Sequence, residues 1–152
     1  MTPSMTSDTS RRASPRSLDG AGVVRSLVAG LLYGGGAFSI GFGLGVVREL
    51  MLAPYITSDL AIVVETPIMM WIVFHLARAF ARWLKVPTTG AARLLMGTAG
   101  LALVVAAENQ LSWVWQARSI FEQWALYGFL AAAATFVGLA WFWMAPTFFS
   151  RR

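Results

Sequence analysis

The sequence predicts an all-α membrane protein: a polytopic chain with four transmembrane helices and both termini in the cytoplasm. Of its 152 residues, 57% are hydrophobic and only 12% are charged, whereas soluble domains carry about 25% charged residues. Four apolar segments, each near the ~20 residues needed to cross a bilayer, are separated by short polar connections. We therefore expect one membrane domain over residues 23–152.

Residues 1–22 are expected to form a disordered basic arm, because they are rich in Ser, Thr, Pro and Arg and offer little apolar surface to bury. The pair Arg11-Arg12 lacks the hydrophobic residues that follow it in a twin-arginine export signal. An organelle transit peptide stays open as an alternative, since the arm is rich in Arg and hydroxyl residues and poor in acids.

The first predicted span covers residues 24–47 and is unusually rich in glycine. Small residues recur along it at spacings of three and four, which places them on one helix face and predicts a close contact with another helix. These residues are Gly30, Gly34, Ala37, Gly41 and Gly45. A connection containing Pro54 follows, with Ser58 or Asp59 as the expected N-cap of the next helix.

The second predicted span covers residues 60–84 and contains an acid, Glu65, close to a proline, Pro67. A carboxylate inside a membrane helix is costly, so it is normally paired, protonated or turned towards a cavity. Pro67 has no N–H for the carbonyl of Val63, which predicts a helix kink beside Glu65. The alternative is a tolerated proline near the start of the helix. His75 is the only histidine and is expected to be a packing or interfacial residue.

The third and fourth predicted spans cover residues 93–115 and 124–149. Glu108 and Asn109 interrupt the third span near its far end. The fourth span is uncharged and carries a second face of small residues, which includes Gly138.

The orientation follows from the distribution of Lys and Arg over the two sides of the membrane. Four crossings place ten of the twelve Lys and Arg residues on one side and only Arg48 and Arg118 on the other. Since cytoplasmic loops carry the excess of positive charge, both termini are predicted to be cytoplasmic.

This topology brings Arg48, Glu65, Glu108 and Asn109 to a similar depth in the outer half of the membrane. One interpretation is structural: Arg48 pairs with Glu65 or Glu108 and holds three helices together. The other is functional: Arg48 holds an anionic ligand, or the two acids exchange a proton.

Several function classes lack support in the sequence. The formal net charge of +5 is distributed as a topology signal and not as a contiguous basic face, so we expect no nucleic-acid partner. Cysteine is absent, and neither G-x-S-x-G nor H-E-x-x-H occurs. We expect no metal or other cofactor, and nothing in the sequence indicates an enzyme.

The run from Gly41 to Leu84 resembles a group of small uncharacterised four-span inner-membrane proteins of proteobacteria. In that group a glycine-rich first helix ends in Arg, and a second helix opens with a Glu-x-Pro element and ends in Arg-Trp. The matching positions are Gly41, Gly45, Arg48, Pro54, Glu65, Pro67, Arg82 and Trp83, with Glu108 in a similar place. The resemblance implies a bacterial inner-membrane location and singles out Arg48 and Glu65, but it implies no reaction.

Two functions remain as hypotheses. In the first, the protein is an accessory or interaction subunit of a membrane assembly, and its Arg/Glu layer is structural. In the second, it is a small oligomeric transporter or proton-coupled carrier that uses Glu65. Both predict the lipid bilayer as a partner, together with copies of the chain or other membrane subunits.

Overall fold

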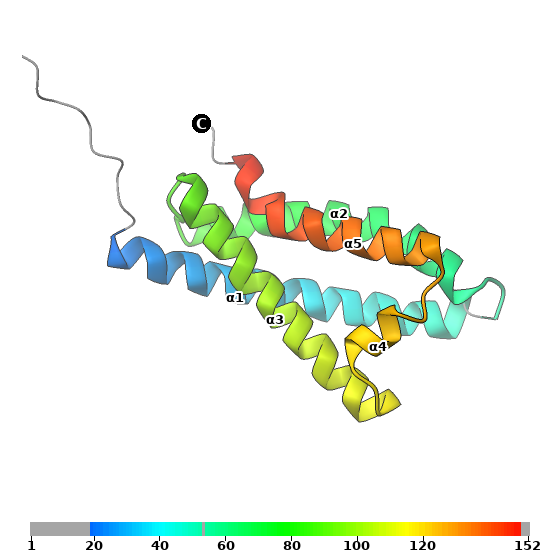
Figure 1. Ribbon diagram of the computed structural model, residues 1–152. Coiled ribbons are helices and arrows are strands. Elements are labelled where there is room, and N and C mark those ends of the chain that lie inside the picture. The colour runs from blue at the N-terminus through cyan, green and yellow to red at the C-terminus, as the bar shows by residue number, and fades with distance from the viewer. Residues whose placement is uncertain (1–18, 53, 150–152) are drawn as a thin grey trace, which may run out of the picture.

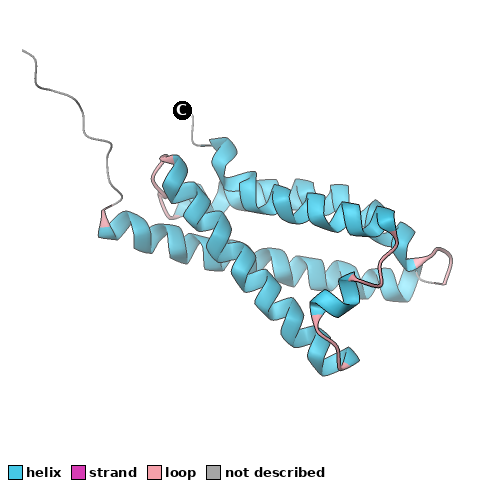
Figure 2. Cartoon of the chain, viewed as in Figure 1, coloured by secondary structure: helices cyan, strands magenta, loops and turns pink. Residues whose placement is uncertain are grey.

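The computed structural model describes residues 19–52 and 54–149, and within these ranges every regular element is a helix (Figure 2). Four helical segments are long and apolar enough to cross a membrane. The prediction of an all-α protein with four transmembrane helices is therefore confirmed. The predicted disordered arm falls mostly on residues 1–18, which lie outside the described residues.

The chain order of the helices is simple (Figure 1). Helix α1 continues directly into a short π-helix, and α5 continues into a short 3-10 helix, so each pair forms one span. The elements are α1 Gly20–Val47, η1 Arg48–Leu52, α2 Ser58–Trp83, α3 Gly90–Gln116, α4 Ile120–Trp124, α5 Phe129–Met144 and η2 Ala145–Phe149.

The first helix begins at Gly20, so the last residues assigned to the arm are helical. Asp19 is its N-cap, and the Asp19 carboxylate accepts a hydrogen bond from the Gly22 N–H at 2.9 Å. This satisfies one of the free N–H groups that every helix start leaves. The sequence could have indicated this helix start, since Asp is a preferred N-cap residue.

The fourth span begins at Phe129 and not at residue 124 as predicted. Trp124 ends α4, a short helix opened by a capping box in which Ser119 and Glu122 bond each other's backbone N–H. The hydrogen bond from the Ser119 N–H lowers the pKa of the Glu122 carboxyl. The prediction failed because residues 124–128 are apolar and uncharged like the span that follows, although Trp124 ends α4 and the next four residues connect it to α5.

The predicted N-cap of the second helix is wrong. Thr57 caps α2 through the Leu60 N–H, and Asp59 has another partner. Its carboxylate accepts a hydrogen bond from the Gly128 N–H at 3.0 Å. Gly128 is the N-cap of α5, a helix whose start has no side-chain cap hydrogen bond. Asp59 thus joins the start of α2 to the start of α5.

Helices α1 and α3 pack most closely, and glycine makes this possible. A Cβ on Gly30 would collide with the Met96 carbonyl oxygen, and one on Gly34 would collide with the backbone of Gly100. On α3, Gly97 lies equally tightly against the Trp143 carbonyl. Small residues let membrane helices approach to backbone contact, which increases van der Waals attraction.

Helices α2 and α5 form the second pair. The Trp141 indole N–H of α5 donates to the Met70 carbonyl of α2 at 3.0 Å. The two pairs meet at Tyr33, which is fully buried, stacks on Phe142 and donates to the Phe142 carbonyl at 2.9 Å. Interhelical hydrogen bonds of this kind contribute about 0.6 kcal/mol on average in a membrane protein.

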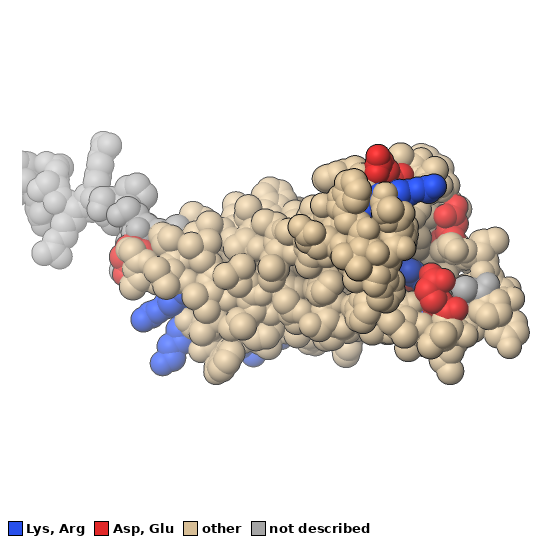
Figure 3. All heavy atoms as spheres, turned by 90° about the horizontal axis from the view of Figure 1, so that it is seen from below, with Lys and Arg blue, Asp and Glu red and all other residues tan. Residues whose placement is uncertain are grey.

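The two ends of the bundle differ in charge. Both ends of the described chain lie at the same end of the bundle (Figure 1). Beside the start of α1, Lys and Arg side chains lie with a small acidic patch, whereas most of the acidic side chains in this view lie at the opposite end, together with some basic ones (Figure 3). The turn between α2 and α3 lies at the first end and is held by the buried Arg93, which donates to the carbonyls of Val86 and Pro87.

Candidate functional site

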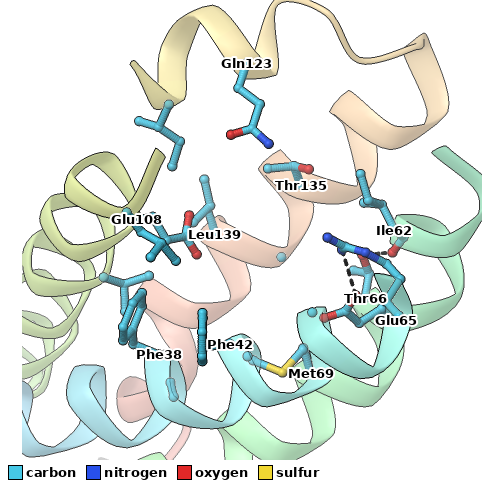
Figure 4. Close-up of a pocket in the computed structure, with 18 of the residues that line it drawn as sticks. Phe38, Phe42, Ile62, Glu65, Thr66, Met69, Glu108, Gln123, Thr135 and Leu139 are labelled. Atoms are coloured by element: carbon cyan, nitrogen blue, oxygen red, sulfur yellow. Dashed lines mark hydrogen bonds and ion pairs between the residues drawn. The ribbon is translucent and has the colours of Figure 1, made fainter. Parts of the chain in front are cut away.

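A cavity of about 630 Å³, drawn in close-up in Figure 4, lies between the helices in the half of the bundle remote from the two ends of the described chain. Its wall includes residues from α1, η1, α2, α3, α4 and α5, so every long helix contributes. Ligand sites in proteins typically measure about 300–1,000 Å³. The cavity therefore has the size of a small-molecule site.

The glycine pattern of α1 explains why the cavity forms there. Gly30 and Gly34 lie in the backbone contact with α3, but the two helices diverge beyond this crossing (Figure 1). Gly41 reaches only the end of the Met69 side chain, and Gly45 has no neighbour within 4 Å. Both line the cavity. Within the described residues, neither Gly41 nor Gly45 thus lies in the close helix–helix contact that was predicted for the whole row.

The fourth-span glycine, Gly138, also differs from the prediction of close packing. A Cβ there would lie 3.7 Å from the Thr66 methyl group, which is an ordinary van der Waals distance. Gly138 faces α2 across the cavity wall without a backbone contact.

Arg48 and Glu65 form an ion pair on one side of the cavity. The Arg48 Nη1 atom donates to Glu65 Oε2 at 2.9 Å, and the two side chains are 27% and 19% exposed. Glu49 lies on the other edge of the same guanidinium, with 3.6 Å between Arg48 Nε and Glu49 Oε1. The pair joins η1 to α2, whereas the structural interpretation expected the pairing to hold three helices together.

Glu108 lies on α3, on a different wall of the cavity from Glu65 (Figure 4). Among residues 19–52 and 54–149, no hydrogen bond or ion pair reaches its carboxylate. The expected polar layer is therefore divided: Arg48 and Glu65 pair with each other, and Glu108 faces the cavity separately. An unpartnered carboxylate in an apolar site is a costly arrangement, which marks it as a functional candidate.

Asn109 does not belong to the site. Its side-chain oxygen accepts from the Ile120 N–H at 3.2 Å, so it anchors the first turn of α4. Because successive residues of an α-helix are rotated by about 100°, the Asn109 side chain points in a different direction from that of Glu108. Adjacency in sequence misled the prediction here.

Pro67 lies well inside α2, which runs unbroken from Ser58 to Trp83. The alternative of a proline near the helix start is therefore wrong. Pro67 leaves the Val63 carbonyl without its helical donor. The predicted kink at this position stays a prediction.

His75 lies further along α2 and packs edge-on against Trp71, with 4.5 Å between the ring centroids.

Several polar residues of the cavity were missed by the sequence analysis. Ser112 donates to Gln123 at 3.2 Å, and this bond ties α4 over α3. Ser112 follows Glu108 by one helical turn, so the spacing of four residues could have placed it on the same face. Gln123 and Tyr127 also line the cavity, but they belong to the connection between α3 and α5. No helical spacing relates them to Glu108, so the sequence did not indicate their place in the site. Burial raises the pKa of Tyr127.

The site thus combines an ion pair, a separate acid and several hydroxyl or amide groups with largely apolar walls. This arrangement suits binding of an amphipathic molecule. No protein-family model matches the chain, and no curated protein or solved structure shows significant similarity to it.

Proposed function

We propose that this chain is a multi-pass protein of the bacterial inner membrane that binds a small amphipathic molecule in the cavity between its outer helix halves. The observation that carries the proposal is the cavity itself, about 630 Å³ in volume, with polar groups confined to a few positions. Sites of this composition bury the apolar part of a ligand and orient it with few polar contacts. The ligand would enter from the outer side of the membrane or from the outer leaflet.

The proposed orientation has both termini in the cytoplasm. The end of the bundle at which the described chain begins and ends carries Arg25, Arg78, Arg82, Lys85 and Arg93 with one acid, Asp19, whereas the opposite end carries Arg48 and Arg118 among five acids. This asymmetry supports the orientation because the cytoplasmic side of membrane proteins is enriched in Lys and Arg. The resemblance to proteobacterial inner-membrane proteins supports the same location.

Reporter fusions test the orientation. Alkaline phosphatase, which is active only outside the cytoplasm, should be active when fused after Tyr55 or Arg118 and inactive when fused after Pro87. A fluorescent protein that matures only in the cytoplasm should give the opposite pattern. Activity of the phosphatase after Pro87, with none at the other two positions, would reverse the proposed orientation.

Filling the cavity tests the binding proposal. Gly45 lines the cavity and has open space around its Cβ position, so Gly45→Trp should occupy the site without disturbing the helix contacts. We expect the purified variant to bind the neutral fluorescent probe N-phenyl-1-naphthylamine at least fivefold more weakly than the unmodified chain. Fluorescence titration, corrected for the probe in empty detergent micelles, measures the change.

Gly43→Trp is the matched control. Gly43 is an exposed glycine of the same helix, two residues away, with nothing within 4 Å and no part in the cavity wall. Its probe affinity should stay within twofold of the unmodified chain. Equal affinity of all three proteins, or no binding by any of them, would show that the cavity is not a ligand site.

A second candidate function is that of an accessory subunit, in which the chain packs against copies of itself or other membrane proteins. The observation that favours it is a row of small residues at four-residue spacing on α1, Gly35, Ser39 and Gly43, of which the last two are exposed. Such a row permits close approach of another helix. Purification in mild detergent at native expression, followed by identification of co-purifying chains and measurement of the mass of the complex, separates the two: recovery of the chain alone and as a monomer would contradict the accessory function.

A further inference from the structure

The charges that line the cavity are not balanced. Four charged side chains contribute to its wall: Arg48, Glu49, Glu65 and Glu108. The single guanidinium has a carboxylate oxygen at 2.9 Å from Glu65 and another at 3.6 Å from Glu49. Its charge is therefore already neutralised within the protein. The remaining acid, Glu108, makes no ion pair within the described part of the chain.

This imbalance favours a positively charged ligand over a negatively charged one. An anion in the cavity would have to displace a carboxylate from Arg48 and would meet Glu108 without compensation. A cation, in contrast, supplies the partner that Glu108 lacks. The gain is large inside an apolar site, because charges there interact through a lower effective dielectric constant than in water.

The aromatic residues of the cavity wall also favour a positively charged ligand. Aromatic side chains line the same cavity as Glu108, and the Phe42 ring lies 6.4 Å from the Phe38 ring and 5.9 Å from the Trp115 ring, measured between centroids. Trp124 of α4 also lines the cavity. The faces of aromatic rings attract cations, and apolar groups of a ligand pack against the same rings.

We propose that the cavity binds a lipophilic monocation, such as an amine or quaternary ammonium with aromatic or alkyl groups, and that the Glu108 carboxylate is its counter-ion. This inference rests on the proposed binding function and adds the ligand class to it. A zwitterionic lipid headgroup is a poorer occupant, because its phosphate would lie among Glu49, Glu65 and Glu108.

A pair of ions with the same shape and opposite charge tests the inference. Tetraphenylphosphonium and tetraphenylborate are titrated against the full chain in detergent by displacement of N-phenyl-1-naphthylamine, with correction for partition into empty micelles. We expect the phosphonium cation to bind at least tenfold more tightly than the borate anion. This comparison needs no variant. Equal or tighter binding of borate would overturn the inference.

Glu108→Gln tests the counter-ion. This substitution should weaken phosphonium binding at least tenfold and leave binding of the neutral probe within twofold. The matched control is Glu122→Gln, which removes an equal charge from the same end of the molecule but lies outside the cavity wall. Gln also preserves the capping box at that position. Phosphonium affinity in the control should stay within twofold, and equal losses in both variants would overturn the role of Glu108.

Two further results separate the possible failures. If the neutral probe binds but charge has no effect, the inference about the cation is wrong and the proposed function stands. If no probe binds to the folded chain, the proposed function is wrong as well. Added phosphatidylethanolamine should not displace the phosphonium ion, and displacement would show that the occupant is a lipid headgroup and not a free cation.

Discussion

Gly34→Leu is expected to disrupt the bundle more than any other single substitution discussed above. A Cβ on Gly34 would collide with the Gly100 backbone, and no flexible side chain there could move to make room for the new side chain. Overpacking of a core typically costs about 1–3 kcal/mol, and a backbone collision belongs at or beyond the upper end. Thermal unfolding of the purified protein, followed by helical circular dichroism or by tryptophan fluorescence, measures the loss.

Gly43→Leu provides the control for Gly34→Leu. It introduces the same side chain into the same helix at an exposed position with open space. Its midpoint of unfolding should be equal to or slightly above that of the unmodified chain, because Leu is a better helix former than Gly by up to about 1 kcal/mol and meets no neighbour at this position. If both variants unfold at the same temperature, the α1–α3 contact does not hold the fold together.

A double-mutant cycle on Arg48 and Glu65 should reveal strong coupling between these residues. Arg48→Met leaves a partly buried acid without its cation, and Glu65→Gln leaves the cation with the more distant Glu49. Removal of one partner of a fully buried pair costs about 3–5 kcal/mol; we expect somewhat less here because water reaches both side chains. The coupling energy itself should be about 1–3 kcal/mol.

Arg118→Met serves as the control for the cycle, because Arg118 is exposed and takes part in no ion pair with the described residues. A coupling energy near zero between Arg48 and Glu65 would contradict the structural role. The same variants also distinguish the original functional hypotheses. If Glu65→Gln unfolds normally but no longer binds a ligand or supports transport, Glu65 belongs to the functional site.

Much of the candidate site could be anticipated from individual residues. Arg48, Glu65 and Glu108 were selected because charged groups in apolar sequence are costly, and the helix lengths placed them at one depth. All three line one cavity. The prediction could not determine which acid pairs with Arg48, because this depends on helix rotation. It also could not exclude Asn109, whose side chain serves the start of α4.

The helical fold and the four apolar segments long enough to cross a membrane could be read from the sequence alone, since the length and apolarity of each segment are local properties of the chain. The roles of the glycines, in contrast, depend on how the helices pack. Gly34 and Gly45 are equivalent in sequence, yet one lies in a backbone contact and the other borders a cavity. The physical reason is the crossing of α1 and α3: two straight helices that touch at one point diverge on either side of it. That divergence leaves Glu108 facing a cavity instead of a partner.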